Sequence, residues 1–89
     1  MVILFSQEIL KKMKKIKNKD PKLFKHVQKQ LITFEKNPKH HSLRAHKLTG
    51  QMKNYWSISI NLSVRMVNMQ TSDNEVFFYD IGTHDEIYR

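Results

Sequence analysis

The second half of the chain gathers the side chains best suited to proton and phosphate chemistry. They are His46, Lys47, Tyr55, Arg65, Asp80, His84, Asp85 and Tyr88. Histidine is the usual proton carrier near neutral pH, and arginine holds a phosphate through a planar fork that stays charged. With an aromatic ring to stack on a base, these residue types could cut RNA by 2′-hydroxyl attack, without a metal or any other cofactor.

Positive charge is concentrated in the first half of the chain. The 89 residues carry 16 Lys and Arg against eight Asp and Glu, a net charge of +8. Residues 1–41 hold eleven lysines against three carboxylates, whereas residues 42–89 hold five basic against five acidic side chains. This separation predicts a docking surface for a polyanion such as RNA; a solvated lysine-rich helical surface is the alternative. The candidate RNA contacts are Lys11, Lys14, Lys15, Lys22, Lys25 and Lys29.

Several function classes are disfavoured by composition. The chain has no cysteine, which excludes a thiolate nucleophile, a disulfide and a cysteine zinc site. His40, His41 and His46 have no carboxylate at ligand spacing, so no metal site is expected. No segment approaches the roughly 20 apolar residues of a membrane helix. These features fit a protein of the reducing cytoplasm, and no membrane partner is expected.

Helical periodicity predicts a hairpin over residues 6–37 that follows a short apolar strand at residues 1–5. Ser6 is a suitable N-cap, and Asp20-Pro21 marks the start of a second helix. Apolar residues recur at helical spacing in both segments, with lysines on the other side, and Asn37-Pro38 ends the pattern. The hairpin therefore has one apolar face that must be buried.

Beyond Pro38 the periodicity changes to that of strands. A short extended segment begins at Lys47-Leu48, and strands are expected over residues 55–62, 64–70 and 76–81. In the first of these three, alternation places Trp56, Ile58, Ile60 and Leu62 on the core face. The last residues are expected to form a single helical turn.

The predicted fold is one α+β domain over residues 1–89, in the order β-α-α-β-β-β. An antiparallel sheet is covered on one face by the helical hairpin. Both faces of residues 76–81 are apolar. The face away from the hairpin is therefore either the floor of a groove or covered by a partner.

Four motifs, in order and spacing, resemble the RelE/ParE superfamily of bacterial toxins, and most of all its RelE and YafQ branch. They are His46-Lys47-Leu48-Thr49-Gly50, Tyr55-Trp56-Ser57, Val64-Arg65-Met66-Val67 and Asp80-Ile81-Gly82-Thr83-His84-Asp85-Glu86-Ile87-Tyr88. The resemblance implies a type II toxin that cuts mRNA on the ribosome, inhibits translation and is held inactive by a cognate antitoxin. An acidic antitoxin encoded beside the toxin is expected.

The same resemblance assigns roles to individual positions. The family's phosphate-stabilising arginine falls on Arg65, its C-terminal histidine on His84 and its closing aromatic residue on Tyr88. His46 and Lys47 fall where relatives have basic residues at the rim of the active site. A second histidine of the YafQ type is missing from the middle strands, where Tyr55, Trp56 and Ser57 stand instead. The general base is therefore open between His84, His46 and Tyr88.

Each assignment has a purely structural alternative. Arg65 could form a salt bridge with Asp80, His84 could cap the last helical turn, and Tyr88 could simply pack at the terminus. For the whole protein, one alternative is a ParE-like toxin that binds gyrase without nuclease activity. The other is a non-catalytic RNA-binding domain.

Overall fold

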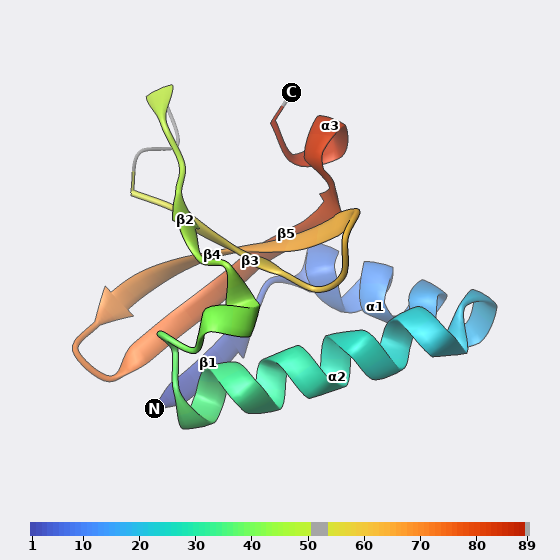
Figure 1. The fold of residues 1–89 in the computed structure, drawn as a ribbon, viewed down its shortest axis with the longest axis horizontal. Coiled ribbons are helices and arrows are strands. Elements are labelled where there is room, and N and C mark those ends of the chain that lie inside the picture. Colours follow the sequence, from blue (N-terminus) through green and yellow to red (C-terminus); the bar gives the residue numbers. More distant parts are fainter. Residues whose placement is uncertain (51–53, 89) are drawn as a thin grey trace.

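The chain forms a five-stranded sheet with a helical hairpin packed on one face (Figure 1). The computed structural model describes residues 1–50 and 54–88. The elements are β1 (Val2–Phe5), α1 (Gln7–Lys19), α2 (Pro21–Lys36), a 3₁₀ turn η1 (His41–Leu43), β2 (His46–Lys47), β3 (Trp56–Ser59), β4 (Val64–Ser72), β5 (Glu75–Thr83) and α3 (His84–Ile87). The predicted α+β fold is confirmed, and so is the single helical turn at the end.

Side-chain caps fix the two long helices at the positions that the sequence indicates. The Ile9 amide donates to Ser6 Oγ (3.0 Å), and the Leu23 amide donates to Asp20 Oδ1 (3.1 Å). Both bonds satisfy amides that a helix start leaves unpaired. Pro21 occupies the first turn of α2, where its missing N–H costs nothing. The hairpin predicted for residues 6–37 is therefore confirmed.

The strand order is β1-β5-β4-β3-β2. The pairs from β2 to β5 are antiparallel as expected, but β1 pairs with β5 in parallel, with Val2 opposite Glu75. The expectation of a wholly antiparallel sheet was therefore wrong for this edge. Turns join the other pairs and fix their direction, whereas β1 and β5 stand at opposite ends of the chain. Four apolar residues alone do not specify which way a partner strand runs.

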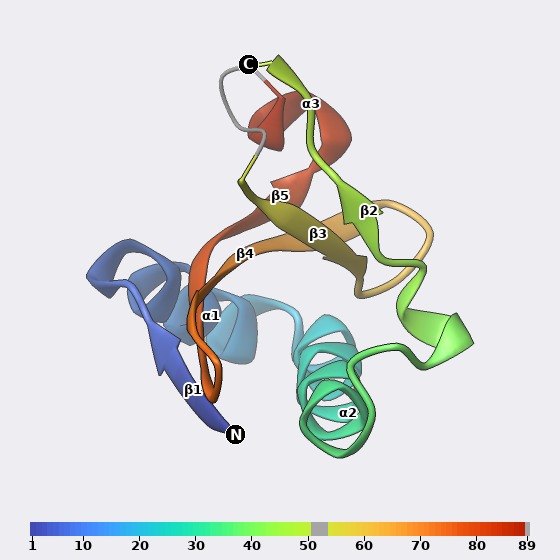
Figure 2. The ribbon, with the colours of Figure 1, turned by 90° about the vertical axis from the view of Figure 1, so that its left-hand side faces the viewer.

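The main core lies between the hairpin and the sheet (Figure 2). Phe78 on β5 is fully buried there, with its ring centroid 5.2 Å from that of Phe34 on α2 and 5.8 Å from that of Phe5 on β1. A smaller cluster of Leu48, Val67 and Ile87 lies apart from this core. Because successive residues of a strand face opposite sides, Val67 is on the sheet face away from the hairpin while Met66 points into the main core.

Two predicted core residues lie at the surface. The strand β3 ends at Ser59, because the Asn61 side chain accepts from the amides of Ser63 (2.9 Å) and Val64 (2.7 Å) and closes a tight turn. Leu62 falls in this turn and is 96% exposed. Trp56 begins β3 and is 44% exposed. The alternating pattern was correct for Ile58 and Ile60 but continued past the true ends of the strand.

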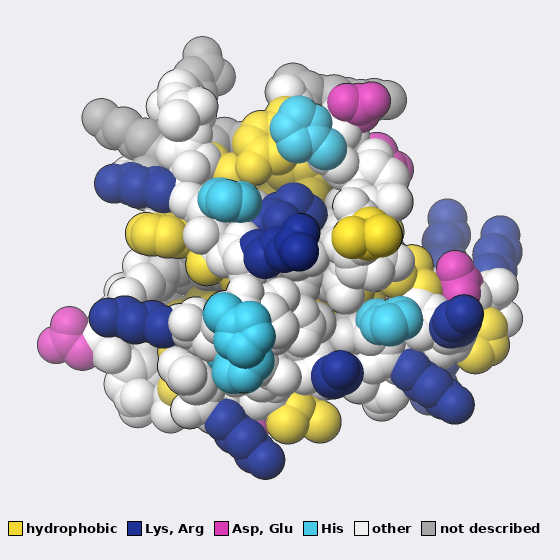
Figure 3. Space-filling model, in the orientation of Figure 1, with side chains coloured by type: hydrophobic (Ala, Val, Ile, Leu, Met, Phe, Trp, Pro, Cys, Tyr) yellow, Lys and Arg dark blue, Asp and Glu magenta, His cyan; other side chains and the backbone are white. Residues whose placement is uncertain are grey.

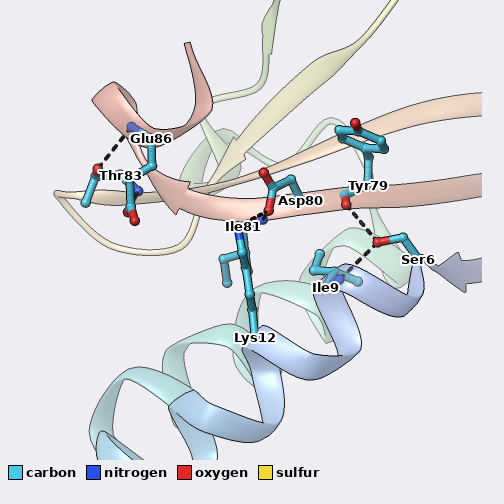
Figure 4. Close-up of polar contacts among 8 residues, drawn as sticks. All are labelled: Ser6, Ile9, Lys12, Tyr79, Asp80, Ile81, Thr83 and Glu86. Carbon is cyan, nitrogen blue, oxygen red and sulfur yellow. Dashed lines mark hydrogen bonds and ion pairs between the residues drawn. The ribbon is translucent and has the colours of Figure 1, made fainter. Parts of the chain in front are cut away.

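Ser6 joins α1 to the sheet, and its loss is expected to lower stability measurably. Its hydroxyl accepts from the Ile9 amide and also donates to the Tyr79 carbonyl of β5 at 2.8 Å (Figure 4). Replacing an N-cap serine with alanine costs about 1 kcal/mol. We expect Ser6→Ala to lower the free energy of unfolding by about that amount in urea titrations, and Ser63→Ala in the exposed turn to have little effect. Equal unfolding midpoints for Ser6→Ala and the parent would contradict this role.

Candidate active site and nucleic-acid surface

Arg65 is the centre of the candidate site. It shares the sheet face of Val67, away from the hairpin, and its guanidinium is anchored by Ser57 and Arg44. Nε donates to Ser57 Oγ at 2.8 Å, and Nη2 donates to the carbonyl oxygens of Arg44 (2.6 Å) and Ser57 (3.1 Å). Within residues 1–50 and 54–88, no hydrogen bond is made by Nη1. The clamp therefore holds one edge of the guanidinium and leaves the other for a ligand.

The electrostatic surroundings of Arg65 identify its neighbours. Partial burial lowers the pKa of its guanidinium, Tyr88 acts in the opposite direction, and Arg44 lowers the pKa further. Arginine stays protonated at neutral pH despite such shifts. A partly desolvated, permanently charged fork is well suited to hold an anion.

Asp80 is not the partner of Arg65. It accepts a 2.7 Å ion pair from Lys12 of α1 and a bond from the Ile81 amide (Figure 4). On β5 the residue opposite Arg65 is Gly82, whereas Asp80 pairs with Val67. The alternative in which Arg65 serves only as a salt bridge to Asp80 is therefore excluded.

The short helix α3 brings Tyr88 near this arginine and packs the His84 ring against Tyr88. Thr83, directly after Gly82, caps the helix: the Glu86 amide donates to Thr83 Oγ1 (3.4 Å), and the Thr83 amide donates to Glu86 Oε1 (2.7 Å). A Cβ on Gly82 would lie only 3.1 Å from the Glu86 side chain. The helix can pack this closely because position 82 is glycine, and buried Ile87 holds it against Leu48 and Val67.

His84 and Tyr88 form a ring pair on the outer side of α3. Their centroids are 4.3 Å apart, with the planes tilted by 31°. The cap of α3 is Thr83, so His84 has no capping role at this turn. Its side chain is 73% exposed, and Nδ1 lies 3.6 Å from the exposed Asp85 carboxylate, a pairing that water screens. The imidazole is thus accessible to a ligand.

His46 and Lys47 form the edge strand on the other side. His46 pairs with Ser57, the residue that anchors Arg65, and Lys47 pairs with Trp56. Both side chains are exposed. Arg65 on β4 therefore lies between β2, which carries His46, and β5, which leads into His84. Figure 3 shows histidine and Lys or Arg side chains gathered over η1, β2 and α3 on this side of the molecule.

Tyr55 lies on the same sheet face but is half-buried. It packs against the Leu48, Val67 and Ile87 cluster, and its ring centroid is 5.5 Å from that of Tyr79. Packing explains part of its position, and contact with RNA stays a prediction.

The six candidate lysines of the hairpin lie apart from Arg65. All are exposed on α1 and α2, the layer on the opposite side of the sheet (Figure 2). The structure therefore separates two surfaces that the sequence could only assign to the two halves of the chain. The lysine surface comprises Lys11, Lys14, Lys15, Lys22, Lys25 and Lys29.

Two members of the Arg65 clamp were not predicted. Ser57 is fully buried, and Arg44 adopts a left-handed backbone conformation (φ 43°) directly after η1, which aims its carbonyl at Arg65. The alternation in residues 55–62 puts Ser57 on the face opposite Trp56, but the register to Arg65 comes only from strand pairing. No pattern in the sequence marks Arg44.

No three His, Asp or Glu side chains among residues 1–50 and 54–88 are grouped closely enough to hold a metal ion. Over the same residues, no helix has the length and apolar character needed to cross a membrane.

Comparison with known proteins identifies the fold. Neither protein-family models nor curated protein sequences match the chain. Solved structures do match the chain, at the level of the fold. A YoeB/ParE toxin from Agrobacterium tumefaciens superposes with a TM-score of 0.82 at 15% identity, over 94% of this chain and 99% of the toxin.

Two further toxins have the same architecture. YoeB from Staphylococcus aureus, solved in complex with YefM, gives a TM-score of 0.78 at 24% identity, over 94% of this chain and 97% of the other. YafQ from E. coli superposes with a TM-score of 0.71 at 20% identity, over 98% of this chain and 97% of YafQ. The expected resemblance to RelE/ParE toxins is therefore confirmed at the level of the fold.

Proposed function

We propose that this chain is the toxin of a type II toxin–antitoxin system and acts as an endoribonuclease that cuts mRNA on the ribosome. The observation that carries the proposal is the Arg65 clamp. Its guanidinium is fixed by Ser57 and Arg44 and has Nη1 unbonded within the described residues, between the strand of His46 and the helix of His84 and Tyr88. This arrangement supplies a phosphate-binding group flanked by proton carriers.

The reaction needs only these groups. The 2′-oxygen of one nucleotide attacks the adjacent phosphorus, the bond from phosphorus to the 5′-oxygen breaks, and a 2′,3′-cyclic phosphate and a 5′-hydroxyl result. One proton leaves the 2′-hydroxyl and one is delivered to the 5′-oxygen. Arg65 stabilises the negative charge that develops on the phosphoryl oxygens between these two transfers.

His84 and His46 are the two histidines on either side of Arg65. They reach the site from β2 and from the end of β5, so one can remove a proton while the other supplies one. Tyr88 is the third candidate for the base, and its ring also offers a surface on which a base can stack. Lys47 pairs with Trp56, on the sheet face opposite Arg65, so a phosphate held by Lys47 would lie at the outer edge of β2 and not beside Arg65.

A protein antitoxin is the proposed regulator, with the ribosome and mRNA as targets in the bacterial cytoplasm. Two of the solved neighbours are toxins in complex with a named partner, YoeB with YefM and YafQ with DinJ. A net charge of +8 on this chain suits an acidic partner.

Gyrase poisoning is the alternative that shares this fold, and one of the superposed structures bears the ParE name. The accessible His84 beside an anchored arginine favours the nuclease. A reconstituted translation assay and a gyrase supercoiling assay, run with the same protein, separate the two. The proposal expects translation to stop and supercoiling to proceed, and the opposite pattern would establish the alternative.

The lysine surface should make ribosome binding steeply dependent on salt. We expect the triple change Lys22→Gln, Lys25→Gln and Lys29→Gln to weaken ribosome binding and to reduce the slope of log K against log salt by about two units, since each lost phosphate contact contributes roughly 0.7–0.9. Filter binding over a range of potassium chloride concentrations measures this slope. An unchanged slope would show that these lysines do not face rRNA, and weaker binding to the antitoxin alone would assign them to that partner.

A further inference from the structure

A hollow lies on the hairpin-facing side of the sheet, beside η1 and the end of α2. It has a volume of about 690 Å³, within the usual range for small-molecule sites. Trp56 and Asn68 pair across β3 and β4 and both line it, on the face opposite Arg65. The hollow is therefore separate from the proposed catalytic site, although the same strands carry both.

Asn68 provides an unused hydrogen-bond donor in this hollow. Its side chain is only 5% exposed, yet its Nδ2 has no partner among the described residues. A buried donor left unpaired is costly, and native proteins contain few of them. The amide also carries an acceptor, so it can match the paired donor and acceptor on the edge of a nucleobase. A ligand that offers such an edge would satisfy Asn68.

Trp56 provides a stacking surface next to this amide. It is the only tryptophan of the chain and lies 44% exposed at the start of β3. Aromatic rings that stack on unpaired bases contribute about 1–3 kcal/mol per base in single-stranded RNA sites. The sequence pattern assigns this residue to the core, and a stacked ligand would cover the ring that the fold leaves exposed.

The rim of the hollow is charged unevenly. Lys39, His40 and Arg44 lie on the side of η1, where the stacked rings of His40 and His41 are 4.5 Å apart. Asp73 and Glu75 lie on the side of the β4–β5 turn. Phosphates would be attracted to the first side and repelled by the second. Arg44 also connects the two sites, because this residue lines the hollow while its carbonyl accepts from Arg65.

We propose that this hollow binds one unstacked base of single-stranded RNA. Trp56 stacks on the base, Asn68 bonds to its edge, and Lys39 and Arg44 hold the adjoining phosphates. The strand then passes around the sheet edge at Arg44 towards Arg65. Only the identity of this strand as the substrate rests on the proposed nuclease function. The binding itself can be tested without cleavage.

The test uses RNA of about eight nucleotides with 2′-O-methyl groups, which cannot be cut by 2′-oxygen attack. Because Trp56 is the only tryptophan, its fluorescence reports on the hollow directly. We expect quenching by the oligonucleotide and none by inorganic phosphate or by an abasic oligomer of equal length. The affinity of the variants is measured by the fluorescence anisotropy of a labelled oligonucleotide. Trp56→Leu should weaken binding roughly tenfold or more. Asn68→Leu should weaken it several-fold and should also change the preference among the four bases.

Lys39→Gln and Lys19→Gln form a matched pair, since each removes one exposed lysine charge and Lys19 lies outside the lysine surface. Weaker binding with the first alone supports the site, whereas equal losses would indicate unspecific attraction and overturn it. Quenching by the abasic oligomer, or a Trp56 signal that depends on protein concentration without RNA, would also overturn it; the latter would indicate a second copy. If quenching occurs but no mRNA is cut, the nuclease proposal fails and the base site stands. If mRNA is cut but no quenching occurs, the base site is wrong and the nuclease proposal stands.

Discussion

Replacing Arg65 with lysine is expected to lower the rate of mRNA cleavage on programmed ribosomes by about 10²–10³-fold, with the fold intact. Lysine keeps the positive charge but loses the planar fork. It can no longer donate to Ser57 Oγ and to the Arg44 carbonyl while presenting a second pair of N–H groups to a phosphate. Removing one preorganised donor from a developing oxyanion typically costs this much.

The comparison with Ser57→Ala tests whether the anchoring itself matters. That variant keeps the guanidinium and removes one of its hydrogen bonds, the 2.8 Å bond from Nε. We expect an intermediate fall in kcat with little change in KM, because a looser arginine still binds but is less well aligned in the transition state. Single-turnover rates and thermal unfolding should be recorded together. An Arg65→Lys variant that is equally stable and cuts at the parental rate would refute a phosphate-binding role for Arg65.

Replacing His84 with glutamine is expected to lower cleavage by about 10²–10⁴-fold, the usual contribution of a positioned proton carrier. Glutamine keeps hydrogen-bonding capacity but cannot transfer a proton at neutral pH. Since His84 is 73% exposed and Thr83 supplies the cap of α3, the substitution should leave stability almost unchanged. Cleavage rates on ribosomes and urea unfolding curves are the two measurements.

His26→Gln is the matched control, because His26 is an exposed histidine on α2, far from β5 in sequence. It should cut at the parental rate. Tyr88→Phe separates the two roles of the closing aromatic: it keeps the ring that packs 4.3 Å from His84 and removes the hydroxyl. A large loss in Tyr88→Phe together with normal activity in His84→Gln would move the proton transfer from His84 to Tyr88.

Local signals in the sequence were sufficient for the helical layer. Ser6, Asp20 and Pro21 mark the helix starts through bonds made within one turn, and the structure contains those bonds. The parallel pairing of β1 with β5 could not be found in this way, because it depends on contacts between opposite ends of the chain. The exposure of Leu62 was missed for a related reason: alternation describes faces but does not fix where a strand ends.

In the candidate site, too, some residues could be found from local sequence signals and others only from the folded structure. The motifs of the family resemblance singled out Arg65, His84 and Tyr88 as candidates. The β4–β5 register sets Arg65 opposite Gly82, just before α3, and Tyr88 acts on the Arg65 guanidinium. The anchor of Arg65 could not be predicted, since the Ser57 hydroxyl and the Arg44 carbonyl approach it only once β3, β4 and η1 are assembled. Likewise, the Asn68 amide nitrogen, which has no partner among the described residues, and the exposed Trp56 ring arise only in the folded chain.

The most direct test of the central claim maps the ends of mRNA after incubation with programmed ribosomes, for the parent protein and for Arg65→Lys and His84→Gln. We predict breaks at coding positions with the parent alone, carrying a 5′-hydroxyl on one fragment and a 2′,3′-cyclic or 3′-phosphate on the other. No breaks with the parent protein, or equal breaks with both variants, would contradict the claim that Arg65 and His84 cut RNA.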